Sequence, residues 1–174
     1  MNMVKPLVAA LLLTVAGSTF AVQKDITITA NVDANIDMTM ADGTALPKSI
    51  EMQYLPGTGL EKYSIGMTKI WSNAVKATDG DVKMKLVSPA QLTTTAGDAT
   101  VVPLTVKWGS DELTDTKELD LKTSDIFPNG DDALLTGSVA KELTFEQTTA
   151  GELGTNTYQG VVSIYLYQAA AAAA

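Results

Sequence analysis

The sequence predicts an all-β protein, built as an antiparallel sandwich of two sheets. Apolar and polar residues alternate with a period of two in many short segments. Turn-forming pairs such as Asp42-Gly43 and Asp79-Gly80 separate these segments, and no long amphipathic helical pattern interrupts them. Short strands with this punctuation are typical of β-sandwiches.

The first and longest alternation covers residues 22–40. Its even positions are mostly apolar: Val22, Ile26, Ile28, Ala30, Val32, Ala34, Ile36, Met38 and Met40. At about 3.3 Å per residue this segment would span about 60 Å, far more than a usual strand. We interpret this segment as packing in two molecules: its first half inserts into a neighbouring molecule, and its second half belongs to the sandwich of its own chain. A single long strand that bends between both sheets of a complete sandwich is the alternative.

Further strands are expected along the rest of the chain. Their alternating apolar positions are Ile50, Met52 and Tyr54; Tyr63, Ile65 and Met67; Val82, Met84 and Leu86; Val102, Leu104, Val106 and Trp108; Leu143 and Phe145; and Val162, Ile164 and Leu166. Residues 132–141 are compatible with a helical turn. No internal repeat is evident, so we expect one sandwich domain over residues 34–168.

The two ends of the chain are set apart from this domain. Residues 1–21 resemble a signal peptide, with Lys5 before a short apolar core and Ala21 at a cleavage position. The apolar core is too short to span a bilayer, so we expect an exported mature chain without a membrane span. Residues 169–174 form an alanine tail, which has helix propensity but no hydrophobic face with which to dock.

Composition narrows the possible functions. The net charge is −8, all twelve basic residues are lysines, and the chain has neither Cys nor His. Acid–base catalysis by His, thiol chemistry and disulfides are therefore excluded. An acidic chain without Arg lacks the basic surface that nucleic-acid binding requires. We expect no catalytic residue, no cofactor and no metal ion.

Two short patterns resemble catalytic or metal-binding motifs. Ser138 and Lys141 match S-x-x-K and would make an exported hydrolase, but the companion motifs of penicillin-recognising enzymes are missing. Asp125 to Gly130 imitates the start of a calcium loop, yet Phe127 occupies a ligand position. An ordinary surface segment explains the S-x-x-K pattern better, and a solvated loop explains the calcium-like pattern better.

The two tryptophans are candidates for a binding surface. Trp71 or Trp108 would stack a sugar if exposed, although core or rim positions fit them better.

The residues themselves point to an interaction between the chain ends. A C-terminal strand over residues 158–167 would leave a free edge if its neighbouring strand were missing. A free edge of this kind invites pairing with an extended segment. In this interpretation Val162, Ile164 and Leu166 form the edge of an acceptor groove. The side chains that would fill the groove are Val22, Ile26, Ile28, Ala30 and Val32.

Several stretches resemble the major pilins of class 5 fimbriae, the colonisation-factor type, and most closely the cable-type pilins of Burkholderia. The stretches are residues 22–33, 41–47, 54–57, 82–86, 102–106 and 158–164. They follow family order across nearly the whole mature chain. Ala34 departs from the pattern, because members often place Pro there.

The resemblance implies an incomplete immunoglobulin-like sandwich, which the N-terminal donor strand of the next subunit (residues 22–33) completes. The protein would be the major shaft subunit of an adhesive fimbria on the cell surface, and not an enzyme. Implied partners are identical subunits, a periplasmic chaperone, an outer-membrane usher and a tip adhesin. The alternative is a self-complete extracellular β-sandwich that binds a carbohydrate or receptor.

Overall fold

The computed structural model describes residues 35–97 and 99–169. The chain divides into two units at residues 31 and 32, and all described residues belong to the second unit. Within them, no helix is long and apolar enough to cross a membrane. The donor stripe at residues 22–33, the signal peptide at 1–21 and most of the alanine tail lie outside the described residues.

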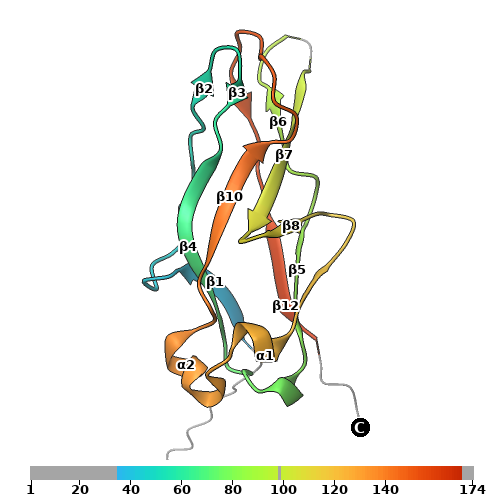
Figure 1. Ribbon diagram of the computed structural model, residues 1–174. Helices are drawn as coiled ribbons and strands as arrows, with labels where there is room; N and C mark the ends of the chain where they lie inside the picture. The colour runs from blue at the N-terminus through green and yellow to red at the C-terminus, as the bar shows by residue number, and fades with distance from the viewer. Residues whose placement is uncertain (1–34, 98, 170–174) are drawn as a thin grey trace, which may run out of the picture. The chain divides into compact units, whose positions relative to one another are not determined.

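The larger sheet carries the strands in the order β1-β4-β10-β7-β6-β11, with β8 paired to β7, and all its pairs are antiparallel (Figure 1). The bounds are β1 (Ile36–Met40), β4 (Tyr63–Ser72), β6 (Gln91–Thr94), β7 (Val101–Trp108), β8 (Asp111–Leu113), β10 (Lys141–Gln147) and β11 (Tyr158–Gln159). Strand β7 pairs with β6 through its first half and with β10 through its second half. It therefore links the β6-β11 part of the sheet to the β1-β4-β10 part.

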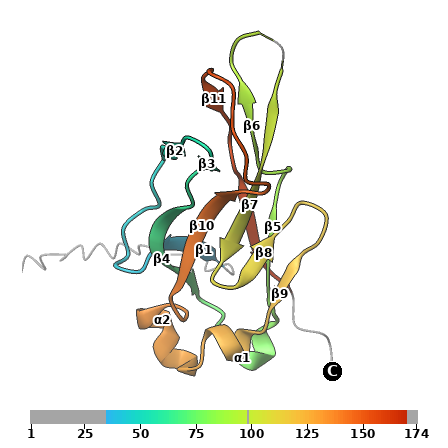
Figure 2. The ribbon, with the colours of Figure 1, turned by 45° about the horizontal axis from the view of Figure 1, so that its top comes forward.

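The smaller sheet has the order β12-β5-β9, again antiparallel. Its members are β5 (Val82–Leu86), β9 (Leu119–Leu121) and β12 (Ile164–Gln168). A short hairpin of β2 (Tyr54–Leu55) and β3 (Gly59–Leu60) stands at one end of the sandwich. The opposite end carries η1 (Ala77–Asp79), α1 (Thr123–Ile126), η2 (Gly130–Asp132) and α2 (Ala133–Thr136) (Figure 2). We call these the hairpin end and the helix end.

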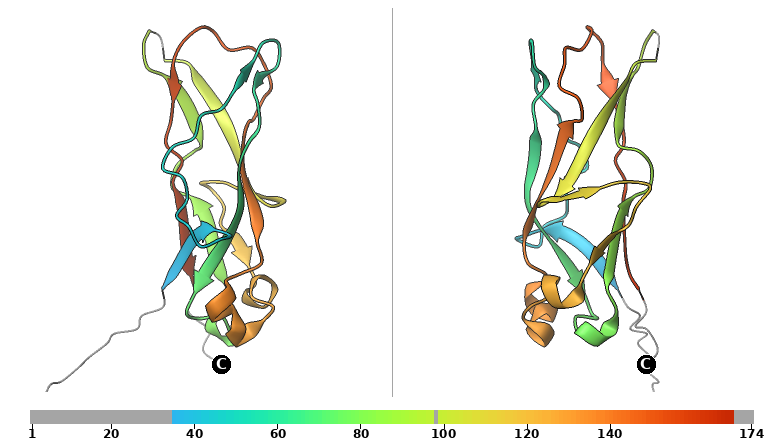
Figure 3. Two further views of the ribbon diagram at one scale, coloured as in Figure 1. Left: turned by 90° about the vertical axis from the view of Figure 1, so that its left-hand side faces the viewer. Right: turned by 45° about the vertical axis from the view of Figure 1, so that its right-hand side comes forward.

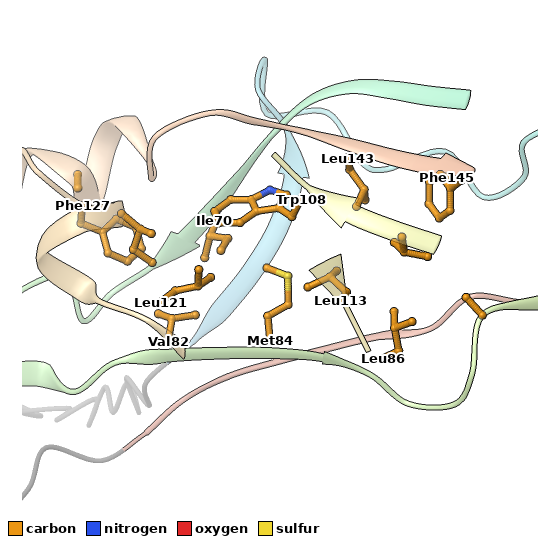
Figure 4. Packing of buried hydrophobic residues seen from close by; sticks show 14 of the residues in the cluster. Ile70, Val82, Met84, Leu86, Trp108, Leu113, Leu121, Phe127, Leu143 and Phe145 are labelled. Carbon is orange, nitrogen blue, oxygen red and sulfur yellow. The ribbon is translucent and has the colours of Figure 1, made fainter. Parts of the chain in front are cut away.

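Apolar side chains from both sheets meet in one core (Figure 4). Val82, Met84 and Leu86 of β5 are buried, as their alternation predicts. Trp108 is fully buried, and its indole N–H donates to Thr68 Oγ1 at 2.9 Å. Thr68 in turn donates to a backbone carbonyl of β10 at 2.9 Å, so this buried polar pair is satisfied.

Strand β4 departs from simple alternation. Ile65 packs against the core, as expected, but Met67 is exposed, and Ile70 is buried. The register against β10 shifts between Leu143 and Thr144, opposite this part of β4. The extra residue forms a β-bulge that switches which face points inward. The prediction that Met67 lies on the dry side is therefore wrong.

Two other expected strands are incomplete. Residues 46–53 belong to no strand, so only the end of the expected segment at Ile50, Met52 and Tyr54 is paired, within β2. The expected C-terminal strand is split into β11 and β12 by residues 160–163. At this break a Cβ on Gly160 would collide with the Gln91 carbonyl oxygen. The two segments approach too closely there for a regular ladder with ordinary side chains.

Candidate subunit-docking groove

The described residues enclose a long groove of about 940 Å³ in the half of the sandwich nearer the hairpin end. One wall is formed by residues 46–54 and the other by residues 156–164. The floor consists of apolar side chains of the larger sheet and its neighbours: Ile65, Leu92, Leu104, Leu143 and Phe145. The groove therefore opens directly onto the hydrophobic core.

The wall at residues 156–164 is hydrogen-bonded on the side away from the groove. Residues 158 and 159 pair with β6, and the Ser163 carbonyl accepts from Val87 N at 2.9 Å. In the opposite wall, residues 46–53 belong to no strand, and the Gln53 carbonyl accepts a hydrogen bond from Glu61 N at 2.8 Å beside the β2–β3 hairpin. Both walls thus run along a gap where a sandwich would carry one more strand.

Strand β1 fills the same gap at the other end. It pairs with β4 along its whole length and also lies beside β12. Ser72 Oγ donates to Gln168 Oε1 at 2.8 Å, and Gln168 Nε2 donates to the Ala74 carbonyl at 2.7 Å. These bonds join the end of β4 to β12 below the groove. The groove is consequently closed toward the helix end and reaches Tyr54 and Leu60 at the hairpin end.

The groove is chemically suited to an extended apolar segment. Among its lining residues the charged side chains are Lys48 and Glu51, both exposed on the same wall. Ile50 and Met52 are neighbours of these charges on the same wall and pack against the core. Alternating apolar side chains beside extended backbone are what β-augmentation requires. The five floor side chains are all apolar, so they offer nothing for acid–base chemistry.

The predicted acceptor residues are distributed over the groove and the strand below it. Val162 and Ile164 line the groove and are partly buried against the core. Leu166 also packs on the core but lies in β12 opposite Met84, outside the groove lining. The donor residues lie outside the described residues: Val22, Ile26, Ile28, Ala30 and Val32.

Sequence reasoning misses the second wall and the floor. The alternation of Ile50 and Met52 is the correct signal for two side chains on one face, but it predicts an ordinary strand. The patterns around Leu104, Leu143 and Phe145 predict a closed core. Nothing in a local pattern tells a core side chain from a groove floor, because both are inward positions of a paired strand.

The residues of the S-x-x-K pattern have structural roles. Ser138 Oγ accepts from Ile70 N at 2.8 Å and donates to the Val139 carbonyl at 2.8 Å. Lys141 Nζ lies 2.8 Å from Asp111 Oδ2. Both members of the pattern are therefore engaged with partners other than each other.

The calcium-like loop and the second tryptophan also serve the fold. Phe127, which stands at a ligand position of the calcium pattern, is buried against the apolar cluster. Trp71 is half-buried and donates to Thr39 Oγ1 at 2.7 Å. Over residues 35–97 and 99–169, no group of three or more acidic, His or Cys side chains is placed to hold a metal ion.

The described fold is an antiparallel, immunoglobulin-like sandwich with an open apolar groove along one edge. The family model for the CS1 type fimbrial major subunit matches residues 22–167, and the chain belongs to this family.

Two curated relatives come from Escherichia coli. The chain is 35% identical over 158 residues to a fimbrial subunit of CFA/I, with 87% of this chain and 88% of the relative covered. It is 30% identical over 153 residues to a fimbrial subunit of CS1, with 84% of this chain and 85% of the relative covered.

A solved structure agrees in fold. The CooA pilin subunit from enterotoxigenic Escherichia coli matches with a TM-score of 0.64 and 23% identity, over 79% of this chain and 90% of that chain. The family match and the relatives identify the chain as a major structural subunit of a fimbria, and the fold agrees with them.

Proposed function

We propose that the chain polymerises into a fimbrial shaft by donor-strand complementation, with the groove of each subunit filled by residues 22–33 of another copy. The observation that carries the proposal is the open, apolar groove between residues 46–54 and 156–164. A stripe of alternating apolar side chains in the same chain matches it in kind and length. Each wall, at residues 46–54 or 156–164, would span about 30 Å when fully extended at about 3.3 Å per residue, enough for about four or five inward side chains of a donor strand.

Burial of the donor side chains supplies the driving force. Val22, Ile26, Ile28 and Val32 each contribute about 1.5–3 kcal/mol when their apolar surface leaves water. Backbone hydrogen bonds to the walls add to this, and the entropy of ordering the arm opposes it. A domain stability of about 5–15 kcal/mol is of the same size. The inserted strand would therefore decide whether the sandwich is stable.

The shape of the groove favours one direction of insertion. Strand β1 closes it toward the helix end, so an arm enters from the hairpin end with its first residues deepest. The wall at 156–164 runs from the hairpin end toward β12, while the wall at 46–53 runs toward β2. The donor strand would then lie antiparallel to the first wall and parallel to the second.

Assembly requires that the groove stay covered until a donor arrives, because an exposed edge over an apolar floor aggregates. We infer that a periplasmic chaperone covers it and that an outer-membrane usher exchanges the chaperone for the next subunit. Residues 1–21 would direct export as a cleaved signal peptide. The finished polymer would stand on the cell surface and carry a tip adhesin.

The role proposed is structural and not enzymatic. A closer kinship with the cable-type pilins of Burkholderia remains a prediction from the sequence. A self-complete binding module requires the chain to fill its own groove, and it would stay monomeric at all concentrations. Ile36 pairs with Ser72 at the end of β4, so the arm begins where β1 closes the groove, and this favours insertion into another copy.

We expect Ile28→Asp to abolish filament growth, because a carboxylate would be buried unpaired in the groove. Thr27→Asp is the matched control, since its side chain points away from the groove by parity and the added charge is the same. Export of both variants should be normal, and electron microscopy should show filaments only for Thr27→Asp. Normal filaments from Ile28→Asp would refute insertion of the arm.

A further inference from the structure

We propose that Leu134 and Leu135 at the helix end of one copy dock on Tyr54 and Leu55 at the hairpin end of the next. This head-to-tail contact would stiffen the filament. The proposal rests on the proposed function, because the donor arm is what brings the two ends together. It adds a second interface, made of residues that lie outside the donor strand.

Leu134 and Leu135 form an exposed apolar tip on α2. Leu135 is 86% exposed and Leu134 is 48% exposed, whereas the preceding Ala133 is buried and anchors the helix. A hollow of about 330 Å³ opens just after α2; its lining includes Thr136, Pro128, Val139 and Lys69 but neither leucine. An exposed leucine pair next to a hollow is a surface that gains by being covered.

The opposite end carries a matching apolar tip. Tyr54 is 42% exposed and Leu55 is 43% exposed in β2, just before the turn at Pro56. Tyr54 also lines the end of the groove, so the tip stands beside the entrance for a donor arm. The elements that carry the two tips, α2 and β2, lie at opposite ends of the same sandwich (Figure 3), so one copy cannot join its own pair.

The helix end is tied to the start of the donor arm. Asn35 N donates to Asn73 Oδ1 at 2.9 Å, and Ile36 pairs with Ser72. The same stretch of β4 holds the loop after α2, because Ser138 N donates to the Ile70 carbonyl at 2.8 Å. The arm therefore leaves the fold at the end that carries Leu134 and Leu135.

Chain length then forces the two ends together. The donor stripe ends at Val32 and the described fold begins at Asn35, which leaves at most roughly 10–11 Å of extended chain between them. With Val32 seated near the groove entrance of one copy, the helix end of its neighbour must lie against the hairpin end. This brings the apolar tips at the two ends within reach of each other, and the proposed contact would cover both.

Cysteine cross-linking tests the contact, because the chain has no Cys of its own. We expect filaments of the Leu55→Cys, Leu135→Cys double variant to form disulfide or short bis-maleimide bridges between neighbours. After boiling in detergent without reductant, they should run as a ladder of covalent multimers. The matched control pairs Leu135→Cys with Val87→Cys, since Val87 is exposed between β5 and β6, which carry neither tip. It should give several-fold less multimer.

The result separates this contact from the donor-strand mechanism. Filaments that form but give no more ladder than the control pair overturn the head-to-tail contact and leave the donor strand standing. Failure of the unmodified chain to form filaments overturns the proposed function itself. If the double variant does not assemble, the single variant Leu135→Ser tests the contact instead. Its filaments should dissociate at a lower temperature than those of the unmodified chain, while its monomers should still bind a peptide of residues 22–33. Unchanged dissociation would contradict the contact.

Discussion

Gly160 shapes one wall of the groove through the absence of a side chain. The C-terminal segment crosses so close to β6 that any Cβ at Gly160 would collide with the Gln91 carbonyl oxygen. This approach ends the ladder between β11 and β6 and leads the chain into residues 161–163. Val162 then lines the groove, and Ser163 bonds to Val87 on the other side.

We therefore expect Gly160→Ala to lower the free energy of unfolding by about 1–3 kcal/mol, as overpacking against a backbone atom does. Gly151→Ala is the control, because a Cβ there meets nothing within 4 Å. Thermal melting followed by circular dichroism measures both variants. Equal melting temperatures would mean that the close approach to Gln91 is relaxed at little cost.

Individual residues also show where sequence patterns predict the inward face of a strand correctly and where they fail. The alternation at Val82, Met84 and Leu86 correctly identifies a buried strand face, because a regular strand has only two faces. It misplaces Met67 because the bulge at Ile65, next to Gly66, depends on pairing with β10, which is distant in sequence. Gly66 itself has φ +98°, a conformation that suits glycine, but local periodicity carries no information about the partner strand.

At the scale of elements, one ion pair joins the start of β5 to the start of α1. Lys122 Nζ lies 2.5 Å from Asp81 Oδ2, and the Thr123 N–H donates to Asp81 Oδ1 at 3.2 Å. The hydrogen bond from Lys122, followed by that from Thr123, lowers the pKa of Asp81 below its ordinary value. Asp81 in turn raises the pKa of Lys122.

The sign of the pH dependence follows from these directions. A carboxyl with a lowered pKa stabilises the fold above its unfolded pKa of about 3.9, and this contribution is lost as the pH falls through the folded value. We expect Lys122→Met to lower stability at pH 7 and to flatten the loss of stability below about pH 4. Lys117→Met, at an exposed position outside the ion pair, is the control. Acid titration followed by tryptophan fluorescence measures the effect, and identical profiles for the two variants would contradict it.

The elements also separate what is predictable from what is not. The existence of most strands follows from alternation and turns, and the helical turn expected within residues 132–141 is present as α2. That residues 46–53 form no strand does not follow, because an apolar alternation looks the same whether its partner belongs to the same chain or to another. Whether such a segment pairs with another strand depends on the assembled polymer, and the sequence of one subunit does not say where a strand of the neighbouring subunit will lie.

At the scale of the whole molecule, the sandwich is closed near the helix end by β1 and open near the hairpin end. The same long alternation supplies β1 from its second half, and the proposal assigns its first half to a neighbouring subunit. With an open apolar groove and an apolar arm in one chain, a polymer is the arrangement that covers both.

Supplying the arm as a separate peptide tests this account most directly. A variant lacking residues 22–33 should be unstable alone and become a stable monomer when a peptide of residues 22–33 is added. At a peptide concentration of 100 times Kd the gain is about 2.7 kcal/mol, or several degrees in Tm, and a peptide with Ile28→Asp should give none. If the shortened protein is equally stable with and without the peptide, the groove is not a site for the donor strand.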